Sequence, residues 1–320
     1  MRPVTAVVQL LVGFSLVLSV AAQEAAPAQL EVVRQQCGAE LVTCQDFDAV
    51  VFVHGIYGGT DTFKNPDTGF DWPKEFPNVV KDRRIDVFRL TYRTALLSWA
   101  SGSNPDFEAV AQAVFKAMTP LRKRQYRSIG FVAHSLGGNV VSTYIHMVKT
   151  QLGDPQRSQH AFVITLATPV LGAQIADLAG ELKTLLNMKD PLLNSLQQGN
   201  LYLTMLNEFR LLEVQRELRY VCRPVHLHAA YEEKYLGGLL IVTPQSAAAS
   251  IANLANSPIV GFARNHSTIA KPANSQDVVY QWVQARVEDE YMRIATWDYD
   301  HRMLPPSLRL CEKVGFIPEN

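Results

Sequence analysis

The chain has 320 residues, 48% of them hydrophobic, which is enough to bury one sizeable core. Its 30 basic residues balance its 30 acidic residues, and this balance excludes the strong positive field typical of nucleic-acid-binding proteins. One basic cluster, residues 121–127, is interpreted as a solvated helix end, with contact to anionic lipid head groups as the alternative.

The N-terminus has the pattern of an export signal. Arg2 is followed by an apolar run from Val4 to Val20, and small residues precede a cut after Ala22. We therefore expect a signal peptide at 1–22 and an exported protein, secreted or periplasmic or lumenal, with a retained membrane anchor as the alternative. Residues 23–45 are expected to be a linker, and residues 46–320 a single domain.

Four cysteines remain after the predicted cut, an even number that favours two disulfides in an oxidising compartment. Sequence alone allows three pairings. We prefer Cys37–Cys44, which closes a small loop, and Cys222–Cys311, which ties the C-terminal tail to a late strand. The alternative is four reduced, buried thiols, and none of the cysteines has the spacing of metal ligands.

Buried strands and helices alternate along the chain, which predicts an α/β fold with a mostly parallel central sheet and helices on both faces. Continuous apolar runs predict the strands 49–53, 85–92, 128–133, 161–166 and 225–230, and amphipathic patterns predict helices near 104–118, 139–149 and 276–292. Residues 171–218 show only helical patterns. They are interpreted as a lid-like helical insertion, or alternatively as ordinary packing helices.

The sharpest motif breaks the strand ending at Ala133 and starts the next helix. Ser135 sits in a tight strand–turn–helix segment between the small residues Ala133 and Gly137. Such a turn lifts a serine hydroxyl clear of the sheet and places it at a helix N-terminus, which favours developing negative charge. We predict that Ser135 is a nucleophile, although the usual pattern has glycine where Ala133 stands.

A second motif, Val51–Gly59, follows an earlier strand. An oxyanion needs two preorganised N–H donors. One is predicted to be the backbone N–H of Leu136, just after the nucleophile. The other is predicted to be that of Ile56, since Gly55 lets its loop turn back over the site.

The general base is expected to be a histidine late in the chain. His266 is favoured because it lies in a loop just before the last helix. His226 and His228 share one face of a strand and would suit a metal pair, but no third ligand is evident, so no metal and no cofactor are predicted. His301 lies in the tail, and His54 is interpreted as support for its own loop.

The third member should be an acid at the end of the strand before the histidine loop. Glu232 and Glu233 follow that strand, and only one of them can face the site because successive residues point in opposite directions. Glu232 is favoured, with Glu233 as the alternative. The chain order serine, acid, histidine is the order found in proteins that carry their nucleophile on a strand–turn–helix segment like that of Ser135.

Five segments together resemble lipase-like serine esterases, a branch that includes proteins similar to GPI inositol-deacylases and phospholipid-remodelling esterases. They are His54–Ile56, Ala133–Gly138, Leu166–Gly172, Tyr231–Glu233 and His266–Pro272. The resemblance implies the α/β-hydrolase fold, no metal, and hydrolysis of esters or lipid esters. It also implies Glu232 rather than Glu233 as the acid.

We therefore expect carboxylic ester hydrolysis through an acyl-enzyme, with an acyl ester or lipid as substrate and transient contact with a membrane surface. Two alternatives use the same fold. One is an acyltransferase with the same triad, and the other is a catalytically silent binding protein. The number of subunits is not predicted.

Overall fold

The computed structural model describes most of the predicted domain. The described residues are 28–38, 40–41, 43–55, 58–76, 84–92, 107–169, 222–236, 240–248 and 259–303. The predicted signal peptide and the predicted helical insertion at 171–218 lie outside these ranges, so both stay predictions.

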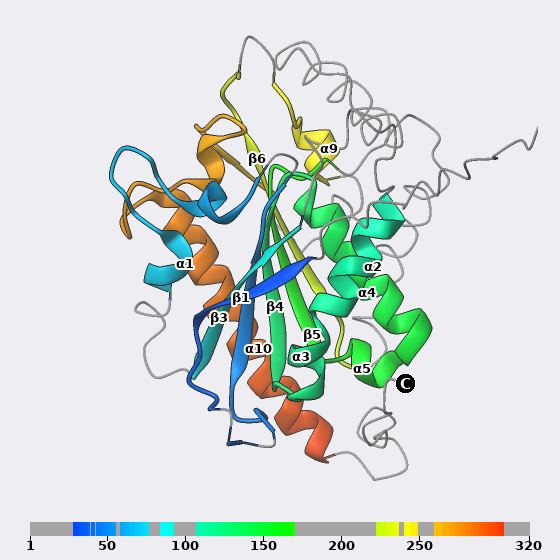
Figure 1. Ribbon diagram of the computed structural model, residues 1–320. Coiled ribbons are helices and arrows are strands. Elements are labelled where there is room, and N and C mark those ends of the chain that lie inside the picture. The colour runs from blue at the N-terminus through cyan, green and yellow to red at the C-terminus, as the bar shows by residue number, and fades with distance from the viewer. Residues whose placement is uncertain are drawn as a thin grey trace, which may run out of the picture.

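A seven-stranded sheet forms the centre of the molecule, in the order β1-β3-β2-β4-β5-β6-β7 (Figure 1). Only β1 runs antiparallel, to β3, and all other neighbours are parallel. The strands are β1 (Gln29–Arg34), β2 (Asp48–Val53), β3 (Ile85–Thr91), β4 (Ser128–His134), β5 (His160–Leu166), β6 (His226–Glu232) and β7 (Ile259–Phe262). The predicted mostly parallel sheet is confirmed.

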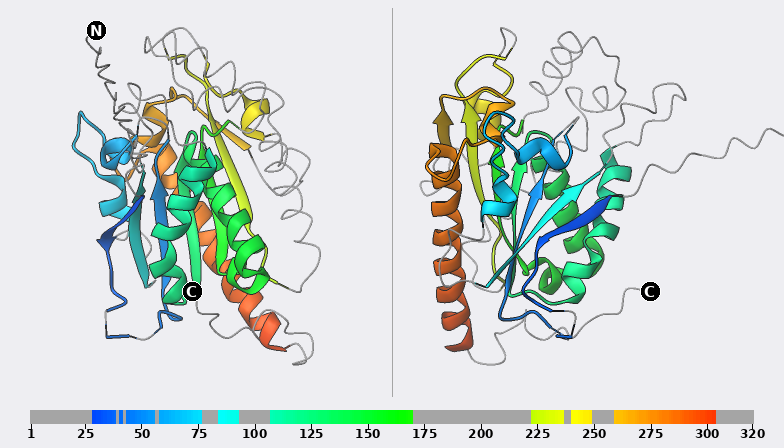
Figure 2. Two further views of the ribbon diagram at one scale, coloured as in Figure 1. Left: turned by 45° about the vertical axis from the view of Figure 1, so that its right-hand side comes forward. Right: turned by 60° about the vertical axis from the view of Figure 1, so that its left-hand side comes forward.

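Helices cover both faces of this sheet, as Figure 2 shows in its right-hand view. On one face lie α2 (Phe107–Ala117), α3 (Thr119–Lys123), α4 (Gly137–Leu152) and α5 (Asp154–Arg157), and on the other lie α1 (Trp72–Glu75) and α10 (Val278–Met303). The shorter α9 (Pro244–Ala248) packs beside β6. The described part of the chain also contains the 3-10 turns η1 (Thr60–Phe63) and η4 (Thr268–Ala270).

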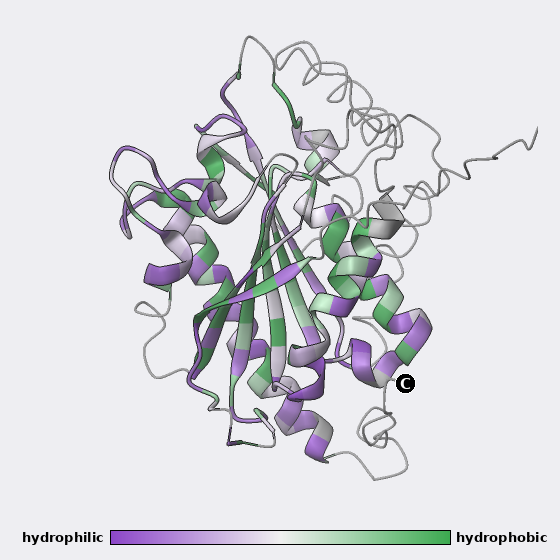
Figure 3. Ribbon diagram, in the orientation of Figure 1, coloured by the Kyte–Doolittle hydropathy of each residue, from purple (hydrophilic) through white to green (hydrophobic). Residues whose placement is uncertain are grey.

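Strand β2 shows why the sheet must be covered twice. Val51 and Val53 pack into the core under α2 and α4, whereas Val50 and Phe52 pack into the core under α10. All four are at most 1% exposed. Figure 3 shows many hydrophobic residues along the central strands and an alternation of hydrophobic and hydrophilic residues along the helices. A strand that is apolar on both faces is stable only between two layers of helices.

Two elements differ from the expectation. Gln29–Arg34 forms β1 inside the segment interpreted as a linker. The sequence did not predict this strand because its side chains are mostly exposed and show no buried-strand pattern. Helix α10 runs to Met303, beyond the predicted end near Met292. Its last turns expose Met292, Tyr299 and Met303, so the hydrophobic periodicity fades before the helix does.

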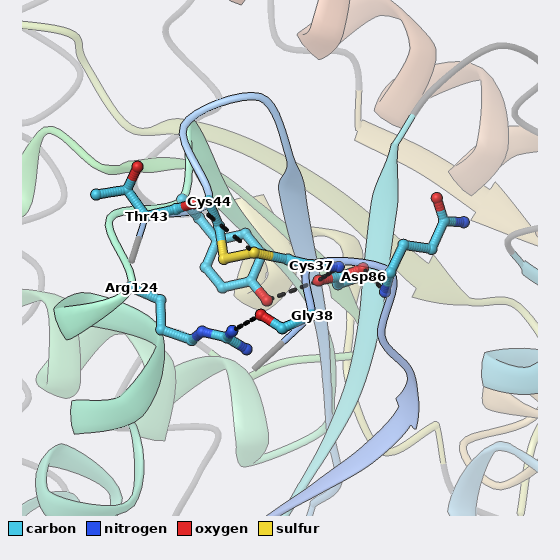
Figure 4. The surroundings of a disulfide bond; sticks show 8 residues. Cys37, Gly38, Thr43, Cys44, Asp86 and Arg124 are labelled. Carbon is cyan, nitrogen blue, oxygen red and sulfur yellow. Dashed lines mark hydrogen bonds between the residues drawn. A yellow bond between two sulfur atoms is a disulfide. The ribbon is translucent and has the colours of Figure 1, made fainter. Parts of the chain in front are cut away.

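The predicted Cys37–Cys44 disulfide is present, at the end of the sheet where β3 and β4 begin (Figure 4). Its loop is held by the buried Asp86 carboxylate, which accepts the Cys37 N–H at 3.3 Å and the Tyr126 hydroxyl at 2.7 Å. Arg124 also donates to the Gly38 carbonyl.

The second predicted disulfide is described at one end only. Cys222 is disulfide-bonded, but its predicted partner, Cys311, lies outside the described residues, and the pairing stays a prediction. Within the described ranges no helix combines the length and apolarity needed to cross a bilayer.

Candidate active site

Ser135 lies at the carboxyl end of β4, where the chain turns sharply into α4. Its φ of 54° lies in the left-handed region that only strained or special turns impose on a residue with a side chain. The turn is fixed by the Ser135 N–H, which donates to the Leu166 carbonyl at the end of β5, 2.9 Å away. The structure therefore places Ser135 in a tight turn between strand β4 and helix α4.

Gly137, two residues after this serine, is required by close packing. A Cβ added to Gly137 would lie closer than 3.0 Å to the carbonyl oxygens of Val53 and His54. Helix α4 therefore starts against the end of β2, and this contact brings the loop after β2 next to Ser135. Ala133, where the usual pattern has glycine, is fully buried in β4 beside Val53.

His266 is the histidine that reaches the serine. Its Nε2 lies 2.9 Å from Ser135 Oγ, and its Nδ1 lies 3.0 Å from Glu232 Oε2. A carboxylate only accepts, so Nδ1 carries the proton and Nε2 is free to accept the proton of the serine hydroxyl. The turn beneath the ring is held by the Asn265 side chain, which accepts the N–H groups of Ser267 and Thr268.

Glu232, the last residue of β6, is fully buried and uses both carboxylate oxygens. Oε2 faces His266, and Oε1 accepts the Val242 N–H at 2.8 Å. Glu233 is exposed and points away, beside Gly261, while its backbone N–H donates to the Phe262 carbonyl. Of the two candidate acids, only Glu232 contacts His266.

Of the two predicted oxyanion donors, Leu136 and Ile56, the structure describes only Leu136. Leu136 is buried directly after Ser135, at the N-terminus of α4, where N–H groups have no acceptor within the helix. A Cβ added to Gly55 would lie 2.5 Å from the Ser135 Cβ and 3.1 Å from its Oγ, so the loop after β2 passes close to the Ser135 side chain. Ile56, the next residue, lies outside the described residues.

His54 supports this loop, and both of its ring nitrogens are used in hydrogen bonds to the backbone. Its Nε2 accepts the Tyr92 N–H at 3.1 Å, and its Nδ1 donates to the Gly55 carbonyl at 2.7 Å. The rings of His54 and Tyr92 stack with their centroids 4.3 Å apart. Burial lowers the pKa of His54, which keeps it neutral.

His134 contacts the loop of His266, and the sequence did not predict this contact. Its Nε2–H donates to the backbone carbonyl of His266 at 2.7 Å, and the two rings lie 5.1 Å apart. Burial, and then the charge that His266 can carry, lower the pKa of His134 to about 3. A neutral His134 therefore ties the end of β4 to the loop that carries His266. Its position directly before the serine is the only signal the sequence offers.

The other histidines lie away from this cluster. His226 Nδ1 and His228 Nε2 contact the two oxygens of Glu290 on α10, at 2.6 and 2.7 Å. Burial by itself would raise the pKa of Glu290, but these hydrogen bonds lower it to about 2. His301 lies near the end of α10. Among the described residues no group of three or more potential ligands is arranged for a metal ion.

Comparison with known proteins shows which family and which folds the chain is similar to. A family model described as "Putative serine esterase (DUF676)" matches residues 45–215, a span that contains Ser135 and ends before Glu232 and His266. No curated protein matches the chain. Solved structures similar to it include a lipase-esterase related protein and a lipase. The lipase-esterase related protein of Clostridium acetobutylicum has 13% sequence identity and a TM-score of 0.45, over 82% of this chain and 99% of that chain. The mature lipase BlEst2 of Bacillus licheniformis has 17% identity and a TM-score of 0.46, over 75% and 92% of the two chains.

Proposed function

The chain belongs to the family described as "Putative serine esterase (DUF676)", and from this premise we propose that it hydrolyses carboxylic esters with Ser135, His266 and Glu232 as a catalytic triad. The mostly parallel sheet with helices on both faces supports an α/β-hydrolase fold. The observation that carries the proposal is one continuous chain of contacts. Ser135 Oγ lies 2.9 Å from His266 Nε2, and His266 Nδ1 lies 3.0 Å from the buried Glu232. A hydroxyl, a neutral base and an orienting carboxylate in this order form an activated nucleophile.

In the proposed reaction, His266 Nε2 takes the Ser135 proton as Oγ bonds to the ester carbonyl carbon. The carbonyl electron pair moves onto oxygen, and the N–H groups of Leu136 and Ile56 stabilise this oxyanion. His266, positively charged and held by Glu232, then donates its proton to the leaving alcohol. A water molecule releases the acyl group by the same steps.

The substrate class is proposed to be an acyl ester or a lipid ester. Membership of the family described as "Putative serine esterase" supports an ester. The resemblance of five sequence segments to lipid-directed esterases supports a lipid ester. We also propose that the enzyme works after export. The Cys37–Cys44 disulfide supports this, since such bonds persist in oxidising compartments.

The test is hydrolysis of nitrophenyl esters of increasing acyl length by the intact protein and by Ser135→Ala, with fluorophosphonate labelling in parallel. We expect labelling of Ser135 and the loss of nearly all activity in the variant, about 10⁴-fold or more. The preferred acyl length would then separate an esterase from a lipase. A folded wild-type protein that neither reacts with the fluorophosphonate nor hydrolyses any ester would overturn the proposal.

A further inference from the structure

The backbone carbonyl of Ser135 is held by two hydrogen bonds, one of which comes from a side chain just beyond the end of the neighbouring strand β5. Thr168 Oγ1 donates to this carbonyl at 2.8 Å, and the Gly138 N–H donates to it at 3.2 Å. Thr168 is 1% exposed and follows the end of β5 by two residues. Its hydroxyl makes no contribution to proton transfer between Ser135 and His266, so another role is needed to explain the contact.

The planarity of the peptide bond supplies that role. The carbonyl of Ser135 and the N–H of Leu136 belong to one rigid plane and point in opposite directions. A donor that fixes the oxygen therefore also fixes the direction of the N–H. A hydrogen bond to the oxygen further polarises the peptide and strengthens the N–H as a donor.

We infer that Thr168 is a positioning residue for the oxyanion donor: its hydroxyl aims the N–H of Leu136 at the site where negative charge develops. This inference rests on the proposed esterase function. In the step concerned, Ser135 Oγ forms a bond to the acyl carbon and the carbonyl electron pair moves to oxygen, while the Thr168 proton stays on Thr168.

The segment that carries Thr168 is built to reach the nucleophile. Ala167 adopts a φ of 50°, an unfavourable left-handed conformation for a residue with a Cβ, and its N–H is tied to the Ala230 carbonyl on β6 at 2.8 Å. On the far side of Thr168, the Asn139 side chain donates to the Pro169 carbonyl at 2.9 Å. Residues on both sides of Thr168 are thus locked to the sheet and to α4.

Gly138 leaves the room that this approach requires. A Cβ at Gly138 would lie closer than 3.0 Å to both Oγ1 and Cγ2 of Thr168. The two successive glycines after Leu136 therefore serve different contacts. Gly137 lets the end of β2 approach, and Gly138 lets Thr168 reach the Ser135 carbonyl.

The test compares Thr168→Val, which keeps the side-chain shape without the hydroxyl, with Thr168→Ser, which keeps the hydroxyl. We expect Thr168→Val to lower kcat by at least about tenfold with KM within about twofold, since a misaligned oxyanion donor acts on the transition state alone. Thr168→Ser should restore most of kcat. The affinity for a trifluoromethyl ketone, whose serine adduct carries an oxyanion, should fall in parallel with kcat.

Thr143→Val is the matched control. Thr143 is also buried, and its Oγ1 donates to a backbone carbonyl, that of Asn139, at 2.9 Å within α4. The Thr143→Val variant should keep kcat and the affinity for the trifluoromethyl ketone near the wild-type values. If Thr168→Val does not fold, Thr168→Ala against Thr168→Ser makes the same comparison with smaller side chains.

The outcomes separate this inference from the proposed function. Unchanged kcat and unchanged ketone affinity in Thr168→Val, with Ser135→Ala inactive, would overturn the inference and leave the esterase proposal standing. An equal fall of kcat in Thr143→Val would also overturn it. A wild-type protein with no ester hydrolysis and no fluorophosphonate labelling would instead remove the premise.

Discussion

At the scale of single residues, the site depends on which atoms can donate and which can only accept. Glu232 and the carbonyl of His266 are acceptors, so they fix the proton positions on His266 and His134 respectively. His266 can then act as the proposed base, while His134 stays neutral and supports the loop. The two rings lie side by side with different roles because their partners differ.

The adjacent glutamates allow a matched test of the acid. Glu232→Gln should lower kcat by about 10²–10⁴, because an amide no longer stabilises the charged form of His266. Glu233→Gln changes the same functional group one residue away, on an exposed side chain, and should leave kcat within about twofold of wild type. Ester hydrolysis by the two purified variants provides the measurement. Equal losses, or a larger loss in Glu233→Gln, would contradict the assignment.

At the scale of elements, the site is assembled where α4 begins against the end of β2. Gly137 and Gly55 are the contacts that allow this approach, since a Cβ at either position meets atoms of the neighbouring segment. The glycines are therefore part of the packing between a helix and a strand, and only indirectly part of the chemistry.

Gly137→Ala should lower the free energy of unfolding by about 1–3 kcal/mol, because the new methyl group meets the backbone of β2, which cannot move aside like a side chain. Gly59→Ala is the control, since a Cβ there has no atom within 4 Å and the backbone φ of −173° suits any residue. Urea denaturation checks both variants. Equal stability of the two variants would contradict this account of Gly137.

The disulfide loop is a second element with a separable role. Removing the bond in the double variant Cys37→Ser/Cys44→Ser should cost about 2 kcal/mol of stability, because the closed loop is short. The ester-hydrolysis rate of the folded fraction should not change, since the loop lies where β3 and β4 begin and Ser135 lies where β4 ends. Thermal denaturation with activity assays tests this, and a fall in kcat without loss of stability would contradict it.

At the scale of the whole molecule, burial of neutral histidines makes stability depend on pH. His134 and His160 are both buried, and burial lowers the pKa of each from 6.5 to about 3. His160 donates from Nδ1 to the Arg157 carbonyl and accepts the Tyr144 hydroxyl at Nε2. The folded protein therefore stays unprotonated at both rings in a range where the unfolded chain binds protons.

The sign of the effect follows directly. As the pH falls from 6.5 toward 3, the unfolded state gains protons that the folded state does not, so each such histidine lowers the free energy of unfolding by about 1.4 kcal/mol per pH unit. His160→Gln should reduce the slope of stability against pH between 6 and 4 by up to that amount. Urea denaturation across this range provides the measurement, and parallel slopes for variant and wild type would contradict it.

Much of the fold could be predicted because the strands are apolar on both faces. Continuous runs such as Ala49–Val53 identify parallel strands without any knowledge of their neighbours. Strand β1 could not be found this way, because an exposed edge strand is defined by its pairing with β3 and not by its own hydrophobic pattern.

The candidate site divides in the same way. The small residues around Ser135 allow the strained turn to be predicted from the sequence. The chain order of Ser135, Glu232 and His266 also follows directly from the sequence. The sequence could not decide which of two adjacent glutamates faces His266, since that depends on how β6 meets the histidine loop. It also could not reveal the His134 and Thr168 contacts, which join residues 132 and 33 positions apart.

By itself, the amino-acid sequence determined the local features of this protein: the buried strands, the turn that raises Ser135, and the residue types needed for ester chemistry. Only the tertiary structure decided which side chains meet, because a hydrogen bond depends on distance and direction in space and not on separation along the chain. The Ser135–His266–Glu232 chain of contacts and the Thr168 bond to the Ser135 carbonyl belong to this second kind.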